Sequence, residues 1–171
     1  MAPKDPGGRV LELPVQVISP ADVHRLSREL ESLEDFLAQS AIRDPGSRMK
    51  LPSSTKLLDE LAAANSFNFL RDGDRQKART FLESLSKYAP VVHISFASDP
   101  SANFMSKLTT RLRATIHPQL LITVGLEPNI AAGCILRTPN RQFDLSLRRA
   151  LVGHENSLIN LLKAQAGVNA A

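Results

Sequence analysis

Two short apolar runs separated by a helical pattern constrain the fold of this chain more than any other feature. The runs are VVHISFA at 91–97 and LLITV at 120–124, and both have the length and β-branched content of buried strands. Between them, SDPS offers a helix cap at Ser98 or Asp99. Apolar residues then recur at helical spacing: Phe104, Leu108, Leu112 and Ile116. A strand, a helix and a strand in this order predict one right-handed crossover with parallel strands.

The chain after this crossover predicts a hairpin and a last helix. AAGCILRT and RQFDL read as two strands joined around Pro139 and Asn140. Asp144 is then expected to cap a helix that runs to about Lys163. Residues 90–163 are therefore predicted to form a small β-α-β-β-α lobe, with residues 164–171 as a disordered tail.

The front half predicts helices instead. Ser19 and Pro20 are suited to the start of a helix, and three helical segments carry apolar stripes. The stripes are Val23, Leu26, Leu30, Leu33 and Leu37, then Leu57, Leu58 and Leu61, then Ala78, Phe81, Leu82 and Leu85. Residues 20–88 are thus predicted as a helical region. Residues 1–19 are predicted as a loose tail followed by an edge strand or extended arm, because apolar residues alternate there around Pro14. The fold class is α+β.

Composition limits the function classes. Hydrophobic residues make up 43% of the chain, enough for a buried core, whereas aromatic residues make up 5%, with no Trp, which argues against a stacking platform for bases. A single Cys excludes an internal disulfide and a multi-cysteine zinc site. No signal-peptide pattern and no apolar run of membrane-spanning length is present, so a soluble cytoplasmic chain is expected. The net charge of +4 favours an acidic partner: nucleic acid, an anionic membrane face or an acidic protein.

The residues that could carry chemistry favour structural roles. Cys134 sits inside a predicted strand, where cysteine behaves as a small hydrophobe rather than a nucleophile. His154 lies on the apolar stripe of the last helix without a second metal ligand at helical spacing. No phosphate-cradling loop follows a strand. We therefore predict no catalytic, cofactor-binding or metal-binding residue.

Four arginines gather around the hairpin and the start of the last helix. They are Arg137, Arg141, Arg148 and Arg149. A solvated basic face and a nucleic-acid groove both explain such a cluster, and Phe143 is the only aromatic residue near it.

Residues 90–163 resemble the C-terminal region of the ATP synthase delta subunit, the bacterial counterpart of OSCP. The resemblance is carried by VVHISFAS before a helix and by LLITVGLEPNIAAGCILRTPNRQFDLSLRRALVGHENSLINLL. Glu127 stands at the family's acidic position after the second strand, Ala132-Gly133 stands in place of a glycine pair, and Asp144-Leu145-Ser146 supplies the family's Asp-x-Ser. Gly133 would let its strand bend or approach a packed helix, and Asp144 and Ser146 would satisfy free N–H groups at the helix start.

This resemblance implies a non-catalytic peripheral-stalk (stator) subunit of an F-type ATP synthase, which supports proton-driven ATP synthesis. Its partners would be the N-termini of the alpha subunits and the b-type stalk helices, at the cytoplasmic face of the cell membrane. The family's N-terminal region is a six-helix bundle, whereas roughly three helices are predicted here. The expected stalk-binding residues lie on the last helix: Leu147, Arg148, Arg149, Leu151, Leu158 and Leu162.

Three other hypotheses remain open from the sequence. The V-type stalk E subunit and the flagellar export regulator have a similar C-terminal lobe, so a related stalk protein is one of them. An RNA-binding accessory protein would use the basic surface and lose affinity steeply with salt. A cysteine-dependent enzyme would label rapidly at Cys134.

Overall fold

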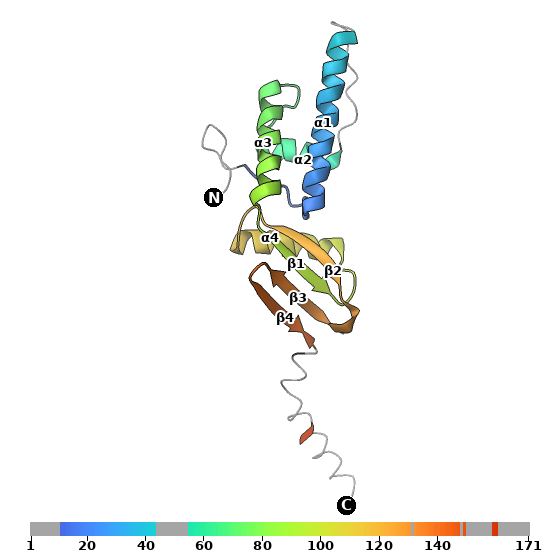
Figure 1. The fold of residues 1–171 in the computed structure, drawn as a ribbon, viewed down its shortest axis with the longest axis vertical. Coiled ribbons are helices and arrows are strands. Elements are labelled where there is room, and N and C mark those ends of the chain that lie inside the picture. Colours follow the sequence, from blue (N-terminus) through green and yellow to red (C-terminus); the bar gives the residue numbers. More distant parts are fainter. Residues whose placement is uncertain (1–10, 44–54, 131, 148, 150–158, 161–171) are drawn as a thin grey trace, which may run out of the picture. The chain divides into compact units, whose positions relative to one another are not determined.

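The structure is a computed structural model, and it describes residues 11–43, 55–130, 132–147, 149 and 159–160. It has an α+β fold, as the sequence predicts (Figure 1). The elements are α1 (Pro20–Arg43), α2 (Lys56–Asn65), α3 (Asp72–Tyr88), β1 (Val91–Phe96), α4 (Ala102–Thr115), β2 (Leu121–Leu126), the 3₁₀ turn Pro128–Ile130, β3 (Gly133–Thr138) and β4 (Arg141–Ser146). The predicted disordered tail and most of the predicted last helix lie outside the described residues.

The chain divides into two compact units. The first comprises Met1–Val91 and Ala102–Thr123, and the second comprises Val92–Ser101 and Val124–Ala171. This division differs from the predicted one between residues 88 and 90, because α4 groups with the helices of the front half. The contacts of Arg113, described below, explain that grouping.

The start of α1 shows why the helix begins where the sequence predicts. The Asp22 carboxylate accepts hydrogen bonds from the backbone N–H groups of Ile18 (3.0 Å) and Ser19 (2.8 Å). The Ser19 hydroxyl accepts in turn from the N–H of Asp22 at 3.3 Å. This reciprocal pattern satisfies donors that a helix end leaves free. An acidic side chain in the first turn also complements the helix dipole.

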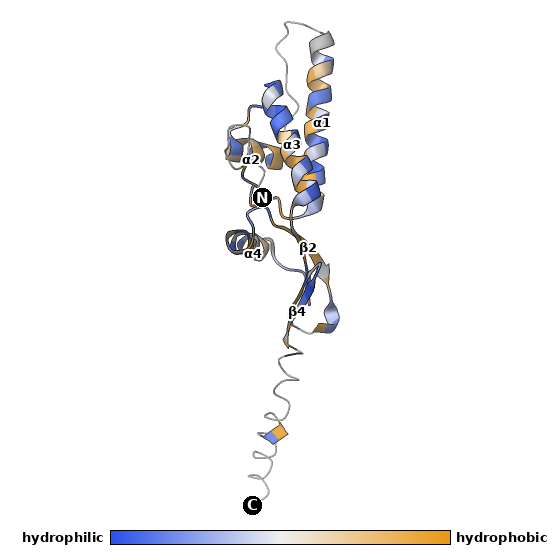
Figure 2. Cartoon of the chain, turned by 60° about the vertical axis from the view of Figure 1, so that its left-hand side comes forward, coloured by the Kyte–Doolittle hydropathy of each residue, from blue (hydrophilic) through white to orange (hydrophobic). Residues whose placement is uncertain are grey.

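The three front helices bury the stripes that the sequence predicts, except that Leu37 and Leu57 are only partly buried. Figure 2 shows hydrophobic residues recurring along α1 and α2 between hydrophilic ones. The core cluster contains Val23, Leu26, Leu30, Leu33, Leu58, Leu61, Ala78, Phe81, Leu82, Leu85 and Leu121, together with Leu11, Leu13 and Val17 from the arm before α1. Burial of about a dozen aliphatic side chains gives this unit a hydrophobic core.

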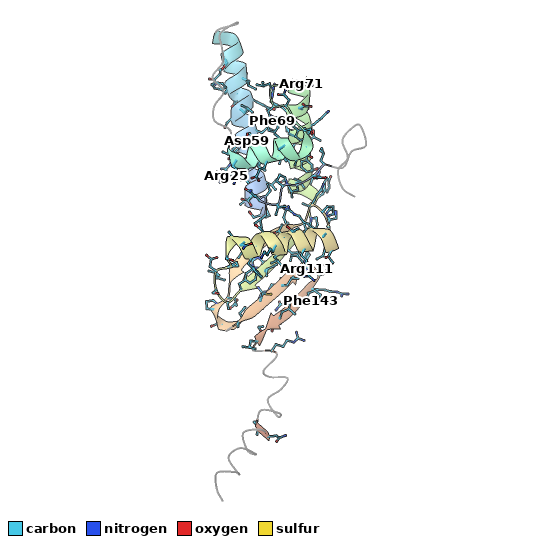
Figure 3. All side chains as sticks on the ribbon, turned by 180° about the vertical axis from the view of Figure 1, so that it is seen from behind. Arg25, Asp59, Phe69, Arg71, Arg111 and Phe143 are labelled. Carbon is cyan, nitrogen blue, oxygen red and sulfur yellow. The ribbon has the colours of Figure 1, made fainter. Side chains whose placement is uncertain are left out.

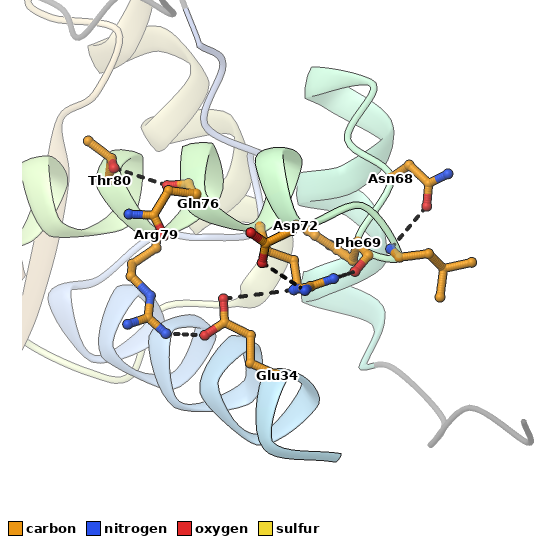
Figure 4. Close-up of polar contacts among 9 residues, drawn as sticks. Glu34, Asn68, Phe69, Asp72, Gln76, Arg79 and Thr80 are labelled. Carbon is orange, nitrogen blue, oxygen red and sulfur yellow. Dashed lines mark hydrogen bonds and ion pairs between the residues drawn. The ribbon is translucent and has the colours of Figure 1, made fainter. Parts of the chain in front are cut away.

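An ion-pair network also joins α1 to α3 (Figure 4). The Glu34 carboxylate on α1 pairs with the guanidinium of Arg79 and lies 4.0 Å from that of Arg75. Arg75 is held in place by Asp72 at 2.9 Å and by the carbonyl oxygen of Phe69 at 2.9 Å. Because these groups are partly exposed, the ion pairs contribute little stability and mainly orient α1 and α3 relative to each other.

The strand order is β2-β1-β3-β4. β1 pairs with β3 and β3 with β4, both antiparallel, and the sheet is mixed. The β2–β1 pair is therefore the parallel one, as the strand–helix–strand order predicts. Thr138 lies opposite Arg141, so Pro139 and Asn140 form the predicted two-residue hairpin turn.

The prediction for α4 was wrong in two respects. The helix begins at Ala102 rather than at Ser98 or Asp99. Its buried residues are Met105, Thr109 and Arg113, whereas Phe104 and Ile116 of the predicted stripe are exposed. The stripes differ by a rotation of one residue, and the buried one includes an arginine, which hydrophobic periodicity does not count.

The arm before α1 forms no strand between residues 11 and 18. It turns at Val15 and Gln16, where the N–H of Val17 donates to the carbonyl oxygen of Pro14 at 3.1 Å. Leu11, Leu13 and Val17 are nevertheless buried. The side chain of Arg113, only 9% exposed, lies against this arm. It donates hydrogen bonds to the carbonyl oxygens of Leu13 (3.3 Å), Pro14 (2.9 Å) and Val17 (2.5 Å). The alternation of apolar residues thus marks burial in the core rather than a place in the sheet.

Candidate partner-binding surface

The register of the strands in the second unit separates an apolar face from a polar one. Residues directly opposite in antiparallel strands point to the same face of a sheet. Ile94 lies opposite Leu136, which lies opposite Phe143, and Phe96 lies opposite Cys134, which lies opposite Leu145. The other face carries His93, Ser95, Ile135, Arg137, Gln142 and Asp144. One side of these three strands is therefore apolar except at its hairpin end, where Thr138 lies opposite Arg141.

Gly125 shows how β2 is oriented on the same sheet. A Cβ added at Gly125 would lie 2.9 Å from Nε2 of His93 and 3.2 Å from Oγ of Ser95. Gly125 therefore faces the polar side, and its neighbours Val124 and Leu126 face the apolar side, because side chains alternate along a strand. We call the set Val124, Leu126, Ile94, Phe96, Cys134, Leu136, Phe143 and Leu145 the apolar face.

The apolar face is covered at its centre and open at its margins. Ile94 and Phe96 on the inner strand β1 are buried. Leu145 on β4 is 63% exposed and Leu126 on β2 is 60% exposed. Val124 and Phe143 are also exposed, and Figure 3 labels Phe143 on β4. Neighbouring exposed aliphatic and aromatic side chains on an ordered strand are typical of a protein–protein contact surface.

The residues that follow β4 add to this margin. The N–H of Leu147 donates to the carbonyl oxygen of Ala132 at 2.9 Å, and the Oγ of Ser146 accepts from the N–H of Arg149 at 3.4 Å. Ser146 therefore caps the helical turn that begins at Leu147. Leu147, the first helical residue, is exposed. The apolar margin of β4 thus continues into the start of this helix.

The prediction that Asp144 caps this helix was wrong. Asp144 lies within β4, and its Oδ1 accepts from the N–H of Ser146 at 2.9 Å. It therefore holds the backbone of the capping serine from two residues before it, and the Oγ of Ser146 accepts from the N–H of Arg149. The Asp-x-Ser pattern therefore marks the start of the helical turn correctly, but the capping residue is Ser146 rather than Asp144.

Gly133 is required by the pairing of β3 with β4, not by a helix. Its φ is +93°, and a Cβ added there would lie 2.4 Å from the carbonyl oxygen of Leu145. Only glycine adopts such a φ readily and leaves that space free. The close backbone approach expected at Gly133 is therefore confirmed, and the neighbour is the backbone of the adjacent strand rather than a packed helix.

The described structure contains part of the stalk-binding set predicted from the sequence. Leu147 and Arg149 are both exposed. Arg148, Leu151, Leu158, Leu162 and also His154 lie outside the described residues. Sequence reasoning missed Phe143 and Leu145 as candidates, although their alternation with Gln142 and Asp144 is the signal of a two-faced strand.

The polar face brings His93 and Ser95 together, which the sequence reasoning did not anticipate. Nε2 of His93 lies 3.4 Å from Oγ of Ser95. Such a pair resembles the nucleophile and base of an acyl-transfer site. Ser95 is only 4% exposed, however, and Gly125 closes over it. A substrate carbonyl cannot reach this hydroxyl, so we assign the pair a packing role.

Cys134 lies on β3 and is half-buried rather than fully buried. Burial raises the pKa of its thiol above the ordinary value, which lowers the thiolate fraction at neutral pH. We expect a thiol reagent such as DTNB to label Cys134 in the native chain at least tenfold more slowly than in urea. Equal rates in the two conditions would contradict this prediction.

Small-molecule and metal chemistry have little support in the part of the chain that the structure describes. No group of three or more His, Cys, Asp or Glu side chains that could hold a metal occurs among those residues. A cavity between α1 and α3, of about 40 Å³, is lined by Ser27, Leu30, Glu31, Arg79, Leu82 and Glu83. It has room for a few water molecules, not for a cofactor. None of the helices described is long and apolar enough to cross a membrane.

Comparisons with known proteins do not assign the chain to a family. No protein-family model matches the chain, and no curated protein matches it at a significant level.

Proposed function

We propose that this protein is a non-catalytic subunit of the peripheral stalk of an F-type ATP synthase. The observation that carries the proposal is the exposed apolar margin formed by Phe143, Leu145 and Leu147. An amphipathic helix buries its apolar stripe against such a surface. A stator has to resist the torque of the rotor, and this task calls for extended contacts with partner helices.

The order of elements supports the same proposal. β1, α4, β2, β3 and β4 follow in the order that the resemblance to the delta subunit implies. In this proposal the b-type stalk helices contact the margin of β4 and the terminal helix. The front unit would contact the N-termini of the alpha subunits, and the protein would act at the cytoplasmic face of the membrane without spanning it.

Charge supports an acidic partner at this margin. Arg141 on β4 and Arg149 in the terminal helix are both exposed and lie before and after the apolar residues in sequence. Basic residues at the rim of an apolar contact attract acidic helices and speed their association. Nucleic acid is a weaker match, because Phe143 is the only aromatic residue among those that form the apolar margin.

Two separate substitutions on β4, one on each face of the strand, test the proposal. The tagged chain would be recovered from solubilised membranes of its own cells, with and without nuclease. We expect alpha, beta and b-type subunits to copurify with the unmodified chain whether or not nuclease is present. Leu145→Asp should reduce this recovery at least tenfold, because it places a charge in an apolar contact.

The matched control is Gln142→Asp, which adds the same charge to the polar face of the same strand. It should leave recovery of the partner subunits unchanged. Both residues are exposed, so neither variant should disturb folding, which circular dichroism can verify. Equal recovery with the two variants, or recovery only of RNA-associated proteins that nuclease removes, would refute the stalk assignment.

A further inference from the structure

Side chains and backbone groups of the first unit form hydrogen bonds with the backbone of the arm at residues 11–18. Asn65 on α2, which is 7% exposed, makes two hydrogen bonds with Glu12. Its Oδ1 accepts from the N–H of Glu12 at 2.8 Å, and its Nδ2 donates to the carbonyl oxygen of Glu12 at 2.9 Å. One side-chain amide thus imitates the pairing that a neighbouring strand would supply.

Two further elements contact the same arm. Arg113 on α4 donates to the carbonyl oxygens of Leu13, Pro14 and Val17. The N–H of Ile122 on β2 donates to the carbonyl oxygen of Ile18 at 2.8 Å. Groups from α2, α4 and β2 therefore hold successive parts of one non-helical segment, and all of them belong to the first unit.

Side chains of the arm supply a simple apolar pattern. Leu11, Leu13 and Val17 are buried, whereas Glu12, Val15 and Gln16 are exposed. Apolar pockets for alternate side chains, combined with hydrogen bonds to the backbone, are how proteins bind extended peptides.

The hydrogen bonds of Arg113 distinguish the contact with the arm from ordinary packing in a hydrophobic core. Four carbonyl oxygens accept hydrogen bonds from its guanidinium, three of them on the arm and the fourth that of Leu120. A buried guanidinium is costly unless its donors are satisfied. The carbonyl oxygens of Pro14 and Val17 lie at the two ends of a turn, in which the N–H of Val17 donates to the carbonyl oxygen of Pro14 at 3.1 Å. The site therefore selects a non-helical peptide segment that turns after its proline.

We propose that the first unit contains a peptide site formed by Asn65, Arg113 and Ile122, and that residues 11–18 occupy it as a docked ligand of the same chain. The ligand class is a non-helical peptide that turns after its proline, with the pattern apolar-x-apolar-Pro-x-x-apolar. The site goes beyond the proposed stalk contact, which involves the other unit. When the arm leaves, a peptide of the same class can take its place.

The test uses the full chain with a weakened arm. Leu13→Asp places a charge in a buried pocket of the site and should release the arm. Hydrogen exchange measured by mass spectrometry should then show the amides of residues 11–18 exchanging at least tenfold faster. The amides of α1, α2 and α3 should keep their protection.

A fluorescein-labelled peptide, LELPVQVIS, then reports on the vacated site. Its anisotropy should rise in a saturable way with the Leu13→Asp chain, and not with the unmodified chain, whose own arm fills the site. Val15→Asp is the matched control, because Val15 is an exposed residue of the same arm. It should neither release the arm nor bind the peptide, and a scrambled peptide should not bind to any of the chains.

Three results would overturn the proposal. Loss of protection throughout α1, α2 and α3 in the Leu13→Asp chain would show that the arm is an inseparable part of the fold. A released arm without specific peptide binding would show that the contacts do not form a site. Asn65→Ala, a milder change, should give faster exchange at Glu12 and its neighbours, and no such change would also contradict the proposal.

Discussion

Replacing Arg113 with leucine is expected to lower the free energy of unfolding by about 3–5 kcal/mol. The substitution removes hydrogen bonds to four carbonyl oxygens, those of Leu13, Pro14, Val17 and Leu120. The carbonyl oxygen of Pro14 keeps the N–H of Val17 as a donor at 3.1 Å. A buried acceptor left without a partner costs about 1–3 kcal/mol. Part of this loss is offset because a buried guanidinium is itself costly, as its pKa, lowered by burial to about 10, indicates. Urea denaturation followed by circular dichroism measures the change.

Arg111 provides the matched control for this prediction. It lies on the same helix, is labelled in Figure 3 and is exposed. Arg111→Leu should change the free energy of unfolding by no more than about 0.5 kcal/mol. Arg113→Lys should fall between the two, because an ammonium group cannot reproduce the planar fork of donors. Similar stabilities for the Arg113→Leu and Arg111→Leu chains would show that the arm contacts contribute little.

Gly133→Ala is expected to lower the free energy of unfolding by about 2–4 kcal/mol. At a φ of +93° any residue with a Cβ is strained, and this Cβ would overlap the carbonyl oxygen of Leu145. Relief of the overlap requires β3 and β4 to separate near Ser146, the cap of the terminal helix. Chemical denaturation should show the loss of stability, and hydrogen exchange should locate it in the hairpin.

The control substitution is at Gly73, where the expected change in stability is zero or opposite in direction. Gly73 lies in the first turn of α3, and a Cβ added there has no atom within 4 Å. Gly73→Ala should leave stability unchanged or raise it by up to about 1 kcal/mol, because alanine favours helix. If both glycine substitutions had the same effect, the close approach at Gly133 would not matter for folding.

Apolar spacing alone predicted most of the elements. Residues three and four apart share a helix face, so the leucines at 26, 30 and 33 predicted the buried side of α1 correctly. The β-branched run at 91–97 predicted β1, and the Pro-Asn turn predicted the hairpin and its register. These features follow from contacts between residues close in sequence, so the pattern of the chain determines them.

Predictions failed where a distant residue decides the outcome. The buried face of α4 includes Arg113, which the sequence pattern counts as an exposed charge, because its partners lie about 100 residues away in the arm. The helix cap was predicted at Asp144 rather than at Ser146 because the end of β4 depends on its pairing with β3. The apolar margin of Phe143 and Leu145 became visible only once the order of the strands placed β4 at an edge.

The sequence by itself therefore determined the order of helices and strands, the hairpin and the apolar stripes of the front helices. The tertiary structure decided which residues remain exposed for a partner, which glycine the strand pairing requires, and which charged side chain is buried. The physical reason is that periodicity reports contacts along the chain, whereas burial and hydrogen bonding depend on which distant segments come to lie together.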